Sequence, residues 1–184
     1  ASSRKIATSS GSPWVPSAGA GASGAAVVLV DVTPRLEFQG AGRVVTFMAA
    51  HPDGFSTLSD AAEVIAAYNP HRSRPANVDG LRKVLRQRHD GRWIWRWDPA
   101  FIHSNFDFLR DESTTGTEQF DAISHLLIDG ARRVNAPTLL VRGLLSDVVS
   151  QATVDEFKQL VPHAETVDVS GTGHMIAGDD NDAF

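Results

Sequence analysis

The sequence predicts an α/β fold in which a parallel β-sheet is interrupted by a helical insertion. A continuous apolar run at 25–30, AAVVLV, has the pattern of a strand buried on both faces of a sheet. Residues 36–133 show mostly helical periodicity. Residues 134–184 then return to a strand–helix–strand order with short connections, which is typical of a parallel βαβ unit.

Length and composition fit this class and exclude several others. The chain has 184 residues, 42% of them hydrophobic and 21% charged, which suits one globular domain with an insertion. The net charge of −5 argues against a nucleic-acid partner, and the absence of cysteine excludes disulfides and cysteine nucleophiles. No apolar run approaches the roughly 20 residues of a membrane helix, and the N-terminus lacks a signal-peptide pattern. We therefore expect a soluble, cytoplasmic protein without a membrane partner.

The first part of the chain predicts an arm followed by a strand. Residues 1–24 are rich in Ser, Gly and Ala, so we expect a flexible arm that buries little apolar surface. The strand of segment 25–35 follows and is closed by a proline. Three polar residues lie at its C-terminal end, Asp31, Thr33 and Arg35.

The insertion, 36–133, contains four segments with apolar residues at helical spacing: 41–51, 56–70, 77–91 and 117–134. For the third helix we expect an inward face of Val78, Leu81, Val84 and Leu85. For the fourth we expect a buried stripe of Phe120, Ile123, Leu126 and Leu127. Between these two helices, Trp93, Trp95 and Trp97 alternate with other residues, which predicts an extended segment with three indoles on one side. We favour packing over ligand binding for these indoles.

The last part, 134–184, predicts two strands around a helix. A strand at 136–143 precedes a helix at 150–163, for which Ser150 is a suitable N-cap, and a second strand covers 164–169. Asp147 lies just beyond the first of these strands and His174 just beyond the second. Because the carboxyl ends of neighbouring parallel strands meet in one crevice, we expect these two side chains to converge. An aspartate on one ring nitrogen would fix the tautomer and leave the other nitrogen free to take a proton.

The segments APTLLVRGLLSDVVS and VPHAETVDVSGTGHMIAGD, together with the earlier VVLVDVTPR, resemble the C-terminal half of an α/β-hydrolase. The resemblance covers roughly 25–184 and is greatest to bacterial esterases, lactonases, epoxide hydrolases and haloperoxidase-like enzymes. It implies a partial α/β-hydrolase sheet, formed by 25–35 and 134–184, with 36–133 as a helical cap. It also implies Asp147 as the acid and His174 as the base of a catalytic triad, with no cofactor or metal.

One part of the family pattern is not found in this sequence. Such hydrolases place the nucleophile on a G-x-S-x-G turn between a strand and a helix, upstream of the strand that VVLVDV resembles. The nearest candidate is Ser23 in GASGA, but no strand precedes it and no helix fits before the strand that follows. We therefore expect the nucleophile segment to be missing from this chain. The acids of 178–184 lack the pattern of a calcium loop, and the histidines show no zinc-binding spacing.

Two functions remain open on this basis. The first is hydrolysis of the C–O bond of a small ester, lactone or epoxide, with Asp147 orienting His174 as general base. A serine nucleophile would favour esters and an aspartate nucleophile would favour epoxides. The second is a catalytically inactive, truncated relic or interaction module, which would self-associate through an exposed sheet edge.

Overall fold

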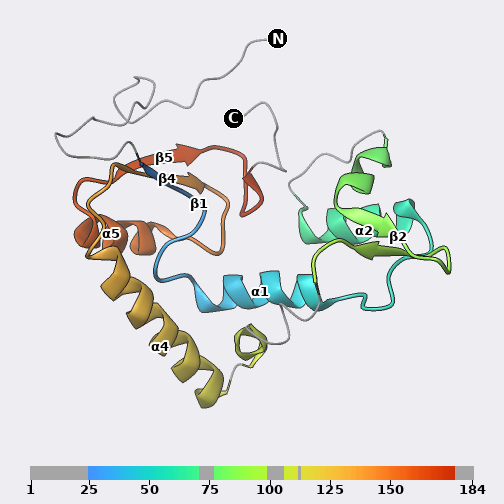
Figure 1. Ribbon diagram of the computed structural model, residues 1–184, viewed down its shortest axis with the longest axis horizontal. Helices are drawn as coiled ribbons and strands as arrows, with labels where there is room; N and C mark the ends of the chain where they lie inside the picture. Colours follow the sequence, from blue (N-terminus) through green and yellow to red (C-terminus); the bar gives the residue numbers. More distant parts are fainter. Residues whose placement is uncertain (1–24, 71–76, 99–105, 112, 177–184) are drawn as a thin grey trace, which may run out of the picture. The chain divides into compact units, whose positions relative to one another are not determined.

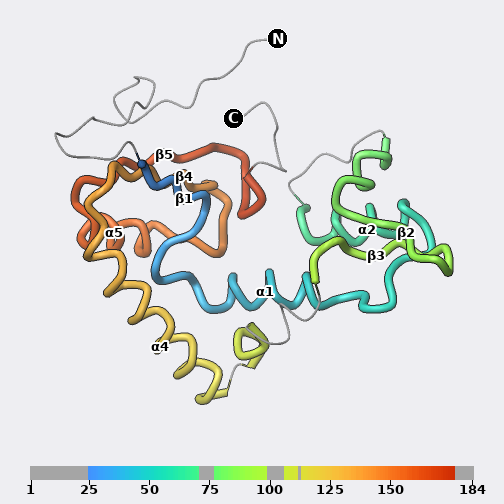
Figure 2. The backbone as a smooth tube through the Cα atoms, in the orientation of Figure 1, coloured from blue at the N-terminus to red at the C-terminus, as the bar shows by residue number. Residues whose placement is uncertain are grey.

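The computed structural model describes residues 25–70, 77–98, 106–111 and 113–176, whose path is drawn in Figures 1 and 2. The chain divides into two compact units. The first combines residues up to Ala41 with those from Thr117 onward, and the second runs from Gly42 to Gly116. The helix that we predicted at 117–134 therefore groups with the sheet unit, so the inserted unit is smaller than the 36–133 predicted.

In the part of the first unit that the structure describes, three strands form a parallel sheet. Strands β1 (Val27–Val30), β4 (Thr138–Gly143) and β5 (Glu165–Val169) lie in the order β1–β4–β5, and both neighbouring pairs are parallel (Figure 1). Every residue of the central strand β4 is buried, which explains the apolar run of Leu139, Leu140 and Val141 at its centre. The α/β class and the parallel sheet predicted from the sequence are confirmed.

Helix α5 (Gln151–Leu160) connects β4 to β5 and packs by an apolar face. Ser150 caps it as predicted, because its side chain accepts a hydrogen bond from the Thr153 N–H. Val154 and Phe157 are buried on its inner side. A second apolar cluster of the sheet unit is formed by Leu139, Val141, Val167 and Ile176.

Helix α4 (Thr114–Ala131) buries a different face from the one that its sequence suggests. Ser124, Ile128 and Ala131 are buried, whereas Ile123, Leu126 and Leu127 are between 41% and 72% exposed. The prediction of a buried stripe that includes these three residues is wrong. Leu126 and Leu127 instead line an open apolar groove of about 350 Å³ together with Val27 and Leu29 of β1.

Strand β1 is an edge of this sheet among the strands that the structure describes, since it pairs with β4 alone. Its burial alternates, and Val28 and Val30 are 53% and 41% exposed. Within the described residues, one long side of β1 therefore has no strand partner, and apolar side chains lie beside it.

The second unit combines helices with a small antiparallel hairpin. Helix α1 (Phe38–Ala49) begins in the first unit and ends in the second, and helix α2 (Leu58–Tyr68) begins with a capping box of Thr57 and Asp60. A 3₁₀ turn, η1 (Asp79–Lys83), leads into the hairpin strands β2 (Leu85–Gln87) and β3 (Trp93–Trp95), and a 3₁₀ turn η2 (Asp107–Arg110) follows. The predicted helix at 77–91 is therefore wrong, because this segment forms the 3₁₀ turn η1 and the strand β2.

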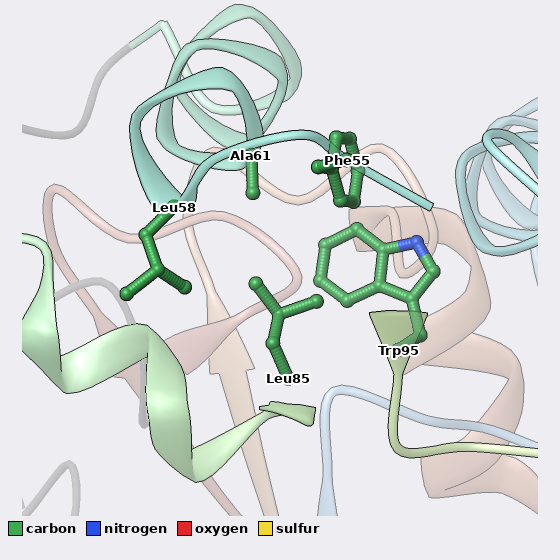
Figure 3. Close-up of a cluster of buried hydrophobic side chains, with 5 residues drawn as sticks. All are labelled: Phe55, Leu58, Ala61, Leu85 and Trp95. Atoms are coloured by element: carbon green, nitrogen blue, oxygen red, sulfur yellow. The ribbon is translucent and has the colours of Figure 1, made fainter. Parts of the chain in front are cut away.

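The core of this unit explains why the hairpin forms. Phe55, Leu58, Ala61, Leu85 and Trp95 point toward one another from α2, the segment before it and the two strands (Figure 3). As a strand residue, Leu85 is fully buried in this cluster, and its neighbour Val84 remains 44% exposed. Trp95 stacks on Trp97 with ring centroids 4.3 Å apart, so these indoles pack within the core as favoured. None of the described helices has the length and hydropathy needed to cross a membrane.

Candidate active site

Three polar segments meet where the parallel strands of the first unit end. Asp31 follows β1 directly, the turn 144–149 follows β4, and the loop 170–176 follows β5. In open parallel sheets, ligands bind in the crevice outside these carboxyl ends. The order β1–β4–β5 places all three segments at one end of adjacent strands.

Asp31 is the central residue of this site. Its side chain is fully buried, and its backbone has a φ of +50°, in the left-handed region that few residues other than glycine adopt. Its own N–H donates to the Val141 carbonyl at 2.7 Å, which continues the sheet pairing by one residue. The carboxylate Oδ1 accepts from the Gly143 N–H at 3.0 Å. Oδ2 accepts from Ser146 Oγ at 2.5 Å and lies 2.9 Å from His174 Nδ1.

His174 is oriented by this carboxylate and retains access to solvent. Its side chain is 26% exposed, whereas that of Asp31 is buried. A carboxylate facing Nδ1 favours the tautomer in which Nδ1 carries the proton, and Nε2 then has a free lone pair. The pair can therefore act as a general base through Nε2, with Asp31 stabilising the imidazolium that forms.

The loop that carries His174 is anchored to the turn after β4. The buried Thr172 donates through Oγ1 to the Val169 carbonyl at 3.1 Å and accepts from the Leu145 N–H at 2.9 Å through its own carbonyl. Gly143 allows this close approach, because a Cβ there would lie 2.3 Å from the Gly173 carbonyl oxygen. The loop that carries His174 and the turn after β4 are therefore held together by backbone contacts.

The predicted partner of His174 requires correction. We expected Asp147 at the ring, but the carboxylate hydrogen-bonded to Nδ1 belongs to Asp31. Asp147 lies in the turn beside Ser146, and its backbone carbonyl faces the start of α1, where a Cβ on Gly40 would lie 1.9 Å from it. β1 is the direct neighbour of β4, so Asp31 reaches the same crevice, and the turn after β4 brings Ser146 rather than Asp147 to the Asp31 carboxylate.

Sequence reasoning could have found Asp31 from a signal that it used elsewhere. Asp31 follows a buried apolar run directly, as polar site residues often do in parallel sheets. What the sequence did not specify was that β1 and β4 are adjacent, which brings together two residues 143 positions apart.

Two other aspartates of the described βαβ unit, Asp168 and Asp155, have partners other than His174. Asp168 pairs with Arg142 through both carboxylate oxygens, at 2.9 and 3.0 Å, and Asp155 accepts from Gln151 at 2.9 Å. Ser23 and the acids of 178–184 lie outside the described residues. Within the part of the chain that the structure describes, no three acidic or histidine side chains are grouped as metal ligands.

The sheet and this buried Asp–His pair define the chain as one with the α/β-hydrolase fold, and comparison with known proteins agrees. Over 159 residues the chain is 26% identical to Esterase Rv0045c of Mycobacterium tuberculosis, an alignment covering 83% of this chain and 47% of that protein. A crystal structure of this esterase matches with a TM-score of 0.55 and 26% identity, over 85% and 47% of the two chains.

Two further solved structures match with higher TM-scores. The E-2-(acetamidomethylene)succinate hydrolase has a TM-score of 0.65 and 22% identity, covering 85% of this chain and 53% of that chain. An α/β hydrolase from Novosphingobium aromaticivorans has a TM-score of 0.61 and 21% identity, covering 86% and 53%. No protein-family model matches the chain. The resemblance to α/β-hydrolases is confirmed, and the chain spans about half the length of the relatives that it matches.

Proposed function

We propose that this chain carries the acid–base half of a hydrolase active site, with His174 as general base and Asp31 as the carboxylate that orients it. The observation that carries the proposal is the Nδ1–Oδ2 hydrogen bond of 2.9 Å between a partly exposed imidazole and a fully buried carboxylate. Its location at the carboxyl ends of parallel strands supports a catalytic role over a purely structural one.

The chemistry follows from the arrangement of the two ring nitrogens. Nδ1 keeps its proton and donates it in a hydrogen bond to Asp31. Nε2 therefore accepts the proton of a serine hydroxyl or a water as that oxygen attacks a carbonyl carbon. The imidazolium then returns this proton to the departing alcohol oxygen, and the C–O bond breaks. The ring ends neutral and Asp31 stays ionised throughout.

An ester is the substrate class that we favour among ester, lactone and epoxide. The relative found by sequence is an esterase, and two structural relatives are hydrolases. Three half-exposed apolar side chains also lie in the segments that form the site: Leu144 and Leu145 follow Gly143, and Met175 follows His174. They would suit an ester with an apolar acyl or alcohol group.

The test is hydrolysis of a short-chain aryl ester by the purified protein and by His174→Ala. His163→Ala is the matched control, because His163 is an exposed histidine whose Nε2 contacts the Ala136 carbonyl at 2.9 Å. We expect a slow turnover from a water activated by His174, which should fall to background in His174→Ala and persist in His163→Ala. Equal rates in all three proteins would contradict the proposal.

That contrary result would favour the interaction module as the function. The observation in its support is the apolar surface of the sheet unit, where Leu126, Leu127, Val28 and Val30 are all at least 41% exposed. Apolar side chains beside an open strand edge are typical of association surfaces.

A further inference from the structure

The hydroxyl of Ser146 lies at the centre of the site without belonging to the Asp–His pair. Its Oγ is 2.5 Å from Asp31 Oδ2, the same carboxylate oxygen that faces His174 Nδ1. It also accepts hydrogen bonds from the N–H groups of Val148 and Val149, at 3.1 and 3.2 Å. Ser146 thus links the turn after β4 to the residue that follows β1.

These contacts leave the Ser146 hydroxyl one orientation. A hydroxyl has one proton to donate and two lone pairs that accept. Both lone pairs are engaged by backbone N–H groups, so the proton points to Asp31. Ser146 is therefore a fixed donor to the carboxylate.

The carboxylate of Asp31 is held at both oxygens as a result. Gly143 donates to Oδ1, and Ser146 donates to Oδ2 beside the imidazole. Rotation of the carboxylate would break both bonds around the fully buried Asp31 side chain, where unsatisfied hydrogen-bonding groups are costly. The plane of the carboxylate, and with it the direction of the bond to His174, is fixed.

We propose that Ser146 is a positioning residue, whose hydroxyl holds Asp31 in the orientation that keeps the proton on His174 Nδ1. The catalytic meaning of this role rests on the function proposed above, whereas the hydrogen-bonding role does not.

The experiment follows the His174 Nδ1 proton by NMR in nitrogen-15-labelled protein, through its exchange with water. Ser146→Ala removes the hydroxyl, Ser146→Cys replaces it with a weak donor of similar size, and Ser146→Thr retains it. Ser150→Ala is the matched control, because Ser150 also accepts from a backbone N–H, that of Thr153, and caps the next helix.

We expect exchange of the Nδ1 proton to accelerate roughly 10- to 150-fold in Ser146→Ala and Ser146→Cys, the range that corresponds to a lost hydrogen bond to a charged group. Exchange in Ser146→Thr and Ser150→Ala should match that of the parent protein. Unchanged exchange in the Ala and Cys variants would overturn the proposal. Equally accelerated exchange of the Nδ1 proton in Ser150→Ala would also overturn the proposal, since Ser146 would then act only by stabilising the turn.

Ester hydrolysis gives a second, separable result. If turnover depends on His174, Ser146→Ala should lower kcat and leave KM unchanged, because the ground-state contacts of the substrate stay the same. If turnover does not depend on His174, the proposed function fails, and the exchange measurement still decides the role of Ser146.

Discussion

Replacing Asp31 with Asn tests whether Asp31, rather than Asp147, is the carboxylate that orients the His174 ring. Asn keeps the size of Asp31 but has one acceptor oxygen in place of two. Three donors now converge on the carboxylate, from Gly143, Ser146 and His174. Whichever way the amide is turned, its NH₂ group faces at least one of these donors.

The magnitude follows from that count. A buried donor left without an acceptor costs about 1–3 kcal/mol, so Asp31→Asn should lower the free energy of unfolding by about 1–3 kcal/mol in its better orientation. The ring would also lose the acceptor that keeps the proton on Nδ1, and the Nε2–H tautomer of His174 should appear. Where turnover is measurable, loss of this acid should lower kcat by on the order of 10⁴-fold.

The assay is nitrogen-15 NMR of the His174 ring, combined with urea unfolding. Asp147→Asn is the matched variant, because it makes the same chemical change one residue from Ser146, in the turn after β4. We expect Asp147→Asn to leave the His174 tautomer unchanged. If Asp147→Asn changed the tautomer and Asp31→Asn did not, the assignment of Asp31 would be refuted.

Three further outcomes are expected. Gly143→Ala should destabilise the protein by roughly 1–3 kcal/mol in urea unfolding, because the new Cβ meets a carbonyl oxygen at 2.3 Å. Gly130→Ala is the control and should be neutral or stabilising, because Gly130 has open space around it. Equal effects of the two substitutions would contradict the close approach at Gly143. In a carbon-13 titration the carboxyl of Asp90 should show a pKa of about 2, lowered from 3.8 chiefly by the hydrogen bond from Arg88. Its stabilising contribution should therefore be lost as the pH falls from about 3.8 to about 2. A midpoint that stays near 2 in Arg88→Ala would contradict this cause. Val28→Lys should reduce the apparent mass of the protein in light-scattering chromatography if the open edge of β1 self-associates, and a monomeric parent protein would contradict that expectation.

Strand β4 and helix α5 could be predicted because burial leaves a plain pattern. Strand β4 is buried along its whole length and has a run of three apolar residues at its centre, and helix α5 has both a capping serine and an apolar face. Strand β1 was predicted to be buried on both faces, but its burial alternates. In the inserted unit the same reasoning found the helix at 56–70 but failed at 77–91. Val84 and Leu85 are equally compatible with a helix and a strand, and only the Asp90-Gly91 pair, a common hairpin-turn sequence, distinguished the two.

Periodicity also could not identify which face of α4 is buried. Ile123, Leu126 and Leu127 form the more apolar stripe, yet Ser124 and Ile128 are the buried residues. A stripe in the sequence indicates that a helix has an apolar face, and the elements beside it determine whether that face is covered. The part of the chain that the structure describes leaves much of this face open.

His174 could be predicted because its glycine-rich loop directly follows a strand, whereas the identity of its acid depended on strand order. Asp31 follows β1 and Ser146 lies in the turn after the adjacent strand β4. The carboxylate therefore comes from one strand and the hydroxyl bonded to it from the other, and both Ser146 and His174 contact the same carboxylate oxygen, Oδ2. Asp31 occupies the left-handed region of backbone conformation, which costs free energy in a residue other than glycine and has no local signature in the sequence. Its bonds to Gly143, Ser146 and His174 offset that cost only once β1, β4 and β5 are paired. The identity of the acid therefore depends on the assembled sheet. This explains why the sequence of the turn after β4, taken alone, led to the prediction of Asp147.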